Sequence, residues 1–227
     1  MRVVLNDKEF IFPSSLSEIT IGQRINFYNE HGQLLDKMLT SILAMEDEIF
    51  RELELVEFQY EKMIRTFAFF ANTTPEAIKA SHFVDDIARI YHSCLAVLVE
   101  EEQAMEPQQE FIWNKEEWEL APPVLNQASQ MKFEELIDSK QMIKDMVEAG
   151  RGKWEYMVKL CAVYFRKKGE RYKEEFLYED SDRIKLMHEL PMDFALQVGF
   201  FLSVSLNFWI NTLMSSASPG PKEAVII

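Results

Sequence analysis

The residues that could carry chemistry begin with four histidines, His31, His82, His92 and His188. On a helix, His82 would lie close to Asp85 and Asp86, and an imidazole with two carboxylates could bind a metal ion. The same residues suit the start of a surface helix, where acidic side chains in the first turn interact favourably with the helix dipole. We therefore expect no metal site and no cofactor.

A cysteine and a histidine could also form a nucleophile and its base. His92 and Cys94 are two positions apart, so their side chains diverge on a helix and cannot pair locally. Cys94 and Cys161 lie in apolar runs without CxxC spacing, which predicts buried thiols in a reducing compartment. The sequence has no GxSxG, phosphate-loop, HExxH or EF-hand pattern, so we expect the protein not to be an enzyme. A helical metalloenzyme or hydrolase stays open as a lesser alternative.

The chain is acidic, with 38 Asp and Glu against 24 Lys and Arg and a net charge of −14. Nucleic-acid binders gain affinity by neutralising phosphates, so we expect no direct nucleic-acid binding. Residues 1–107 contain 19 acidic and 9 basic residues, a net charge of −10, concentrated in residues 46–61 and 100–102. Solvated helical faces explain such runs. An acidic inhibitor or DNA mimic that targets a host factor is the alternative.

Two places in the chain have the pattern of a β-hairpin. Residues 3–13 place β-prone runs around Asn6-Asp7-Lys8, and residues 110–123 place them around Asn114-Lys115-Glu116. Asn and Asp tolerate the left-handed turn conformation, and a proline ends each stretch. A hairpin is therefore expected at each place.

Helical patterns follow the first hairpin. Ser17 and Thr20 are candidate helix caps, Gly32 is a candidate terminator, and a helix is expected over residues 33–44. Residues 46–71 have the three-or-four spacing of an amphipathic helix, with apolar side chains at Ile49, Phe50, Leu53, Val56, Tyr60, Met63, Ile64 and Phe67.

A further helical stretch is expected from Thr74 and Pro75, as cap and first turn, to about residue 103, with a break near Ser81. After residue 107 the order of elements recurs. YEKMIRTFAFFA (60–71) resembles WEYMVKLCAVYF (154–165), with Glu, Met and Ala at matching positions. The sequence therefore predicts an α+β fold, mainly α, made of two tandem related units, each a short hairpin followed by packed helices. The units would cover residues 1–106 and 107–214, before an extended tail at 215–227.

Residues 194–214 form an uncharged stretch long enough to cross a membrane. However, Gln197, Asn207 and Asn211 would line one side of such a helix, and no cluster of Lys or Arg flanks it. A buried or interface helix is therefore expected, and no membrane partner.

Three segments of the second half carry a resemblance to a known group of proteins. They are the helix start Phe133–Asp138, the turn Arg166–Tyr172 and the helix Leu190–Phe201. In this order they resemble small morphogenesis proteins of tailed bacteriophages, including crAss-like and other phages of Bacteroidetes, some of them tail-assembly-chaperone-like. The resemblance covers about residues 130–205, with a fainter likeness in FIFPSSLSEITIGQRI, and it brings no catalytic residues.

The resemblance implies a non-enzymatic bacteriophage structural or virion-assembly protein that acts by protein–protein binding, in the virion or in the host cytoplasm. Its partners would be other phage structural proteins, or further copies of itself in an oligomer. Aromatic helix faces and the apolar end of the tail are the candidate partner-binding residues, namely Phe69, Phe70, Phe201, Trp209, Val225, Ile226 and Ile227.

Overall fold

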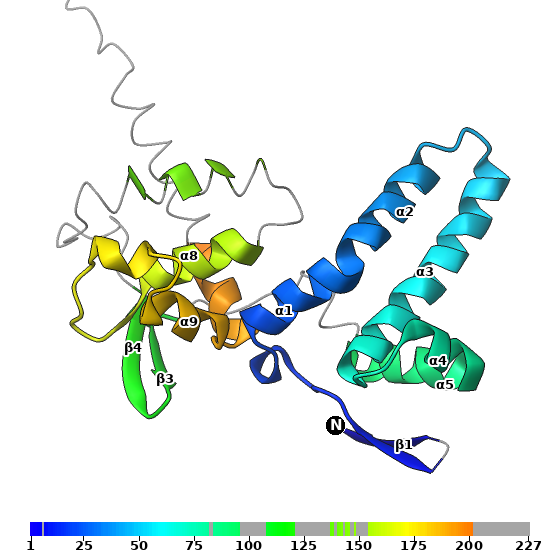
Figure 1. Cartoon of the computed structure of the whole chain (residues 1–227), viewed down its shortest axis with the longest axis horizontal. Coiled ribbons are helices and arrows are strands. Elements are labelled where there is room, and N and C mark those ends of the chain that lie inside the picture. Colours follow the sequence, from blue (N-terminus) through cyan, green and yellow to red (C-terminus); the bar gives the residue numbers. More distant parts are fainter. Residues whose placement is uncertain are drawn as a thin grey trace, which may run out of the picture. The chain divides into compact units, whose positions relative to one another are not determined.

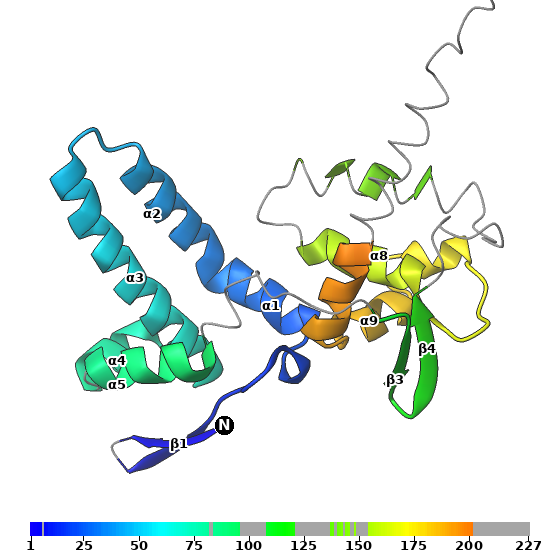
Figure 2. The same cartoon turned by 180° about the vertical axis from the view of Figure 1, so that it is seen from behind.

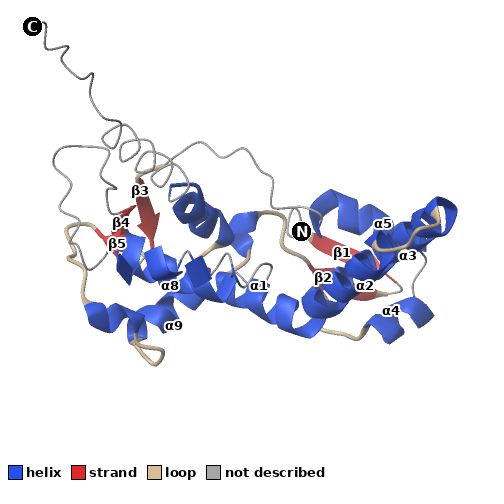
Figure 3. Ribbon diagram, turned by 90° about the horizontal axis from the view of Figure 1, so that it is seen from above, coloured by secondary structure: helices blue, strands red, loops and turns tan. Residues whose placement is uncertain are grey.

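Both expected hairpins are present in the computed structural model (Figures 1 and 3). Strand β1 (Arg2–Leu5) pairs antiparallel with β2 (Lys8–Ile11), and β3 (Glu110–Trp113) pairs antiparallel with β4 (Glu116–Leu120). Asp7, Asn114 and Lys115 have positive φ angles of 60°, 52° and 65°. Tight hairpin turns require this left-handed backbone, and Asn and Asp adopt it at little cost.

The structure describes residues 1–5, 7–81, 84–95, 108–120, 137–138, 140–142, 144–145, 148 and 154–201. Over these residues the protein is α+β, mainly helical, with two small antiparallel sheets. The chain divides into two units. The first comprises Met1–Ala104, Arg151–Glu155 and Leu186–Phe194, and the second comprises Met105–Gly150, Tyr156–Lys185 and Ala195–Ile227. The internal duplication stays a prediction.

The first unit is built mainly from helices that follow the hairpin β1–β2. They are η1 (Leu16–Glu18), α1 (Ile21–Phe27), the π-helical turn η2 (Tyr28–Gly32), α2 (Gln33–Leu43), α3 (Glu48–Phe70), α4 (Pro75–Ser81), α5 (Val84–Ile90) and the π-helical turn η3 (Tyr91–Leu95). Thr20 caps α1 in a capping box with Gln23, and Thr74 accepts a hydrogen bond from the backbone N–H of Ala77 at 3.2 Å. Both threonine caps are therefore confirmed.

Gly32 does not terminate a helix, contrary to the sequence prediction. Its φ of −62° is right-handed, and the chain continues without a break from α1 through η2 into α2. A side chain here would collide with the ring of Tyr28, whose hydroxyl donates to Asp36 at 3.2 Å. Gly32 is thus required by close packing of a ring against the helix, and not by a left-handed cap.

His31 lies on the same π-helical turn and is partly buried between aromatic rings. Its ring centroid lies 5.7 Å from that of Phe27 and 6.4 Å from that of Phe69, and its Nδ1 is buried without a hydrogen-bond partner in the described part of the chain. Burial and the charge of Arg65 lower the pKa of His31, against a smaller opposing effect of Glu30 and Glu76.

This lowered pKa predicts an acid sensitivity of the first unit. In the unfolded chain His31 binds a proton near pH 6.5, whereas in the folded chain it does so only at a lower pH. Because the unfolded chain then binds more protons, the free energy of unfolding should fall as the pH decreases through about 6.5. His31→Leu should reduce this fall. Urea unfolding of both proteins at pH 7.5 and pH 5.5 measures it, and an equal loss in both would assign the sensitivity to other groups.

Two aromatic and aliphatic clusters hold the first unit together. One is formed by the buried side chains of α1, α2 and α3, namely Phe27, Leu35, Ile42 and Phe58. In the other, the ring of Phe67 on α3 packs against Phe10 and Phe12 of the hairpin segment, at centroid distances of 5.7 and 4.8 Å. Helix α3 therefore contacts the rest of the unit on two sides.

The second unit is organised around a three-stranded sheet in the order β3-β4-β5. Its remaining elements, two of which also contribute residues to the first unit, are α8 (Trp154–Tyr164), β5 (Phe165–Lys167), η5 (Glu174–Leu177) and α9 (Asp182–His188). The chain leaves α8 at Tyr164, and the next three residues form strand β5. Phe165 stacks on Trp118 of β4 at 5.1 Å with an interplanar angle of 10°, which explains why the chain leaves the helix here.

Two lysines at the end of β5 form ion pairs with acidic side chains of β3 and β4. Lys167 lies 2.7 Å from Glu116, and Lys168 lies 3.2 and 3.4 Å from Glu110 and Glu117. These pairs join the turn after β5 to the neighbouring strands. Gly169 allows that turn, because its φ of 77° is left-handed.

The uncharged stretch from residue 194 is described only as far as residue 201. Residues 192–201 are helical, and the side chain of Gln197 is buried and accepts a hydrogen bond from the backbone N–H of Gln108 at 3.3 Å. Asn207 and Asn211 lie outside the described residues. Among the helices that the structure describes, none has both the length and the apolar character that crossing a bilayer requires.

Candidate functional site: an exposed apolar face of helix α3

Helix α3 is apolar on two opposite sides. Phe58 and, in part, Leu55 and Phe69 pack into the cluster shared with α1 and α2. At 100° per residue, the side chains of Ile49, Leu53, Val56, Tyr60, Met63 and Phe67 point the other way. A helix with two such faces needs a neighbour on each of them.

Only part of the second face has a neighbour. Figures 1 and 2 show α2 and α3 side by side, with α4 and α5 beside the C-terminal end of α3. There Met63 and Phe67 are buried. Towards the N-terminal end, five large apolar side chains are 43% to 72% exposed, namely Ile49, Phe50, Leu53, Val56 and Tyr60. We call Ile49, Leu53, Val56 and Tyr60 the exposed seam.

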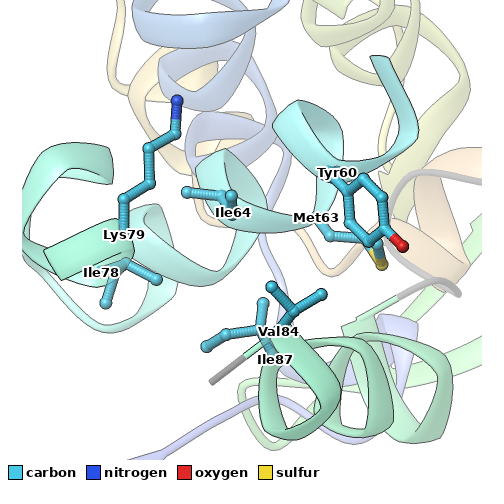
Figure 4. Close-up of a pocket in the computed structure, with 7 residues that line it drawn as sticks. All are labelled: Tyr60, Met63, Ile64, Ile78, Lys79, Val84 and Ile87. Carbon is cyan, nitrogen blue, oxygen red and sulfur yellow. The ribbon is translucent and has the colours of Figure 1, made fainter. Parts of the chain in front are cut away.

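A pocket lies where the exposed seam meets the buried part of the same face. It has a volume of about 120 Å³ and is lined by Tyr60, Met63, Ile64, Ile78, Lys79, Val84 and Ile87 (Figure 4). Helix α3 supplies three of these side chains, and α4 and α5 supply the others. Since the lining is almost wholly aliphatic or aromatic, the pocket suits an apolar side chain more than a polar ligand.

Acidic side chains border the exposed seam. Glu52, Glu54 and Glu57 are exposed, and they make no ion pair with any part of the chain that the structure describes. Other acids of this run are paired: Glu48 lies 3.8 Å from Arg51, and Glu61 lies 3.1 Å from Arg65 and also pairs with Lys79. The free carboxylates thus lie next to apolar surface, and they do not form a continuous acidic face of their own.

The residues considered for chemistry are not brought together. His82 lies outside the described residues, as does the side chain of Cys94. Asp86 pairs with Arg89 at 3.0 Å, and His92 is exposed. Cys161 is fully buried, and this burial raises the pKa of its thiol far above the usual range. The described ranges contain no group of three or more His, Cys, Asp or Glu side chains that could hold a metal ion.

Three of the predicted partner-binding residues, Phe69, Phe70 and Phe201, belong to the part of the chain that the structure describes. Phe69 packs at 5.4 Å from Phe27 and at 5.1 Å from Phe70, and Phe201 packs at 6.2 Å from Tyr164. Trp209 and residues 225–227 lie outside the described residues. Binding by these side chains stays a prediction.

No protein-family model, curated protein or solved structure matches the chain. The site therefore has to be judged on its own geometry. The apolar spacing of residues 49–67 can be read from the sequence, but the exposure of these side chains cannot. The missed signal was the second apolar stripe, Leu55, Phe58 and Phe69, because a helix that needs two neighbours can lack one of them.

Proposed function

We propose that the protein is non-enzymatic and acts by binding another protein through the exposed seam of α3. The observation that carries this proposal is the row of large apolar side chains left exposed on a helix whose other faces are packed or charged. Contiguous exposed apolar surface with a polar rim is typical of protein-binding sites.

We further propose that the setting is the assembly or the virion of a tailed bacteriophage, in the particle or in the host cytoplasm. This step is supported by the resemblance of residues 130–205 to phage morphogenesis proteins. Other phage structural proteins would then be the partners. The positions of the acidic residues favour this function over an acidic inhibitor or DNA mimic. A DNA mimic needs carboxylates spaced along one face like phosphates, whereas the exposed face of α3 carries apolar side chains between its glutamates.

Site-specific crosslinking tests the proposal. In one variant, a photo-crosslinking amino acid replaces Leu53. In the control variant it replaces Ile112, which lies on the sheet of the second unit and is 79% exposed. Both are produced in the native host during infection. We expect position 53, and not position 112, to capture an identified phage structural protein, and we expect the substitution Val56→Glu to abolish the capture.

The result that would overturn the proposal is equal labelling from both positions, or no captured protein from position 53 in cells and in purified particles. Mass spectrometry of mature particles separates the two forms of the proposal. A virion component stays in the particle, whereas an assembly factor is found only in infected cells.

A further inference from the structure

We infer that the occupant of the exposed seam is a basic amphipathic helix of another protein, which packs along α3 as in a coiled coil. This inference rests on the proposed function, since it assumes that the seam binds a protein. It adds the conformation and the charge of the partner segment.

The spacing of the seam specifies a helix as the partner. Ile49, Leu53, Val56 and Tyr60 are separated by four, three and four residues, and Met63 and Phe67 continue the same alternation. This is the a and d pattern of a heptad repeat, which packs by knobs into holes against another helix. The exposed part is about 17 Å long at 1.5 Å per residue, so about three turns of a partner helix would cover it.

The charges beside the seam specify a basic partner. In the heptad register, Glu52 occupies a g position and Glu57 an e position, which are the positions that make ion pairs between coiled-coil helices. Both carboxylates are exposed and have no ion-pair partner in the described chain. Lys or Arg at the matching positions of the partner would pair with them, whereas an anionic membrane surface would be repelled.

The same charges disfavour a second copy of this chain. In a parallel pair, g positions face e positions, so Glu52 of each copy would face Glu57 of the other. In an antiparallel pair, g faces g and e faces e, so Glu52 would face its own equivalent when the pair is centred on residue 52, and Glu57 would do so when it is centred on residue 57. Like charges at these positions are used by natural coiled coils to prevent self-pairing.

The pocket gives the partner helix an anchor point. Tyr60 belongs to the seam and also lines the pocket, so a helix on the seam would place a side chain near its opening. An apolar cavity of ~150 Å³ holds a benzene molecule, so a pocket of about 120 Å³ suits one aliphatic or aromatic side chain. Side chains that fill such pockets tend to dominate binding energy.

Three synthetic 21-residue helical peptides test the inference against the full-length chain. The first has Leu and Ile at a and d positions with Lys at e and g, the second has Glu at e and g, and the third keeps the lysines but scrambles the apolar positions. Fluorescence anisotropy at physiological salt measures binding. We expect the first peptide to bind about tenfold more tightly than either of the others.

Charge reversal on the protein sharpens the test. Glu52→Lys combined with Glu57→Lys should invert the preference, so that the second peptide binds better than the first. The control combines Glu179→Lys with Asp180→Lys, which changes the net charge equally at exposed positions of the second unit and should leave the preference unchanged. Circular dichroism confirms that each variant is folded.

Three outcomes would overturn the inference. The first is that the lysine and glutamate peptides bind equally tightly, and the second is that the scrambled peptide binds as tightly as the first peptide. The third is that the control variant also inverts the peptide preference, because the preference would then follow from net charge alone. Crosslinking from position 53 separates this failure from that of the proposed function. If the captured partner segment is acidic or extended, only the basic helix is refuted. Capture of a second copy of the chain, or of its own residues 202–227, also refutes the basic helix. If no protein is captured, the proposed function is refuted.

Discussion

Phe67→Ala is expected to lower the free energy of unfolding by ~3–5 kcal/mol, the usual cost of removing a buried phenylalanine side chain. Phe67 is fully buried and packs against the rings of Phe10 and Phe12. The substitution would leave a cavity between α3 and the hairpin segment that these rigid rings cannot fill. Urea denaturation followed by circular dichroism measures the loss.

Leu53→Ala is the matched control, because residues 53 and 67 occupy equivalent heptad positions on the same face of α3. Leu53 is 62% exposed, so its truncation should change the free energy of unfolding by less than ~0.5 kcal/mol. A large loss at Leu53 would mean that the chain itself covers this position in solution, and the exposed seam would then not be a free binding surface.

Arg183→Met is expected to destabilise the second unit by about 3 kcal/mol, because it removes one member of a buried set of charged hydrogen bonds. The guanidinium donates to the carbonyl oxygens of Ala162, at 3.4 Å, and Phe165, and it lies 3.2 Å from Glu170. Its central carbon also lies 5.0 Å from the ring centroid of Trp118 and 5.0 Å from that of Phe176. Methionine could fill the space but could not donate any of these hydrogen bonds.

Two further variants define what Arg183 contributes. Arg183→Lys keeps the charge but not the planar fork, so it should recover only part of the loss. Arg171→Met replaces an exposed arginine and should be nearly neutral. Tryptophan fluorescence during urea unfolding measures the loss, since two of the four tryptophans, Trp113 and Trp118, lie in this sheet. Equal losses for Arg183→Met and Arg171→Met would contradict the structural role of Arg183.

Local sequence signals were sufficient for the hairpins and the helix caps. Asp7 and Asn114 have the left-handed backbone of a tight turn, which Asp and Asn adopt more readily than most residues, and Thr20 and Thr74 accept hydrogen bonds from helix N–H groups within their own segments. Such features depend on neighbours within a few residues along the chain, so they can be predicted from the sequence alone.

Features that depend on distant residues could not be predicted in this way. Strand β5 forms because Phe165 stacks on Trp118, which lies 47 positions earlier in the chain. The prediction that Gly32 ends a helix was wrong because glycine occurs both at left-handed helix ends and where a side chain packs closely on the helix backbone. Only the position of the Tyr28 ring distinguishes these two roles. The exposed seam of α3 likewise could not be distinguished from core by its spacing, because exposure depends on where α4 and α5 end.

The walls of the pocket come from three different helices, so a side chain could bind in it only when the protein is folded. Ile78 comes from α4, and Val84 and Ile87 come from α5, so the pocket exists only while both helices are docked on α3. A partner that fills it would bind the native form and not the unfolded chain, and by mass action it would raise the melting temperature as its concentration rises. Chains without a bound partner would then be the ones most open to proteolysis, so the supply of partner would set how much of this protein persists.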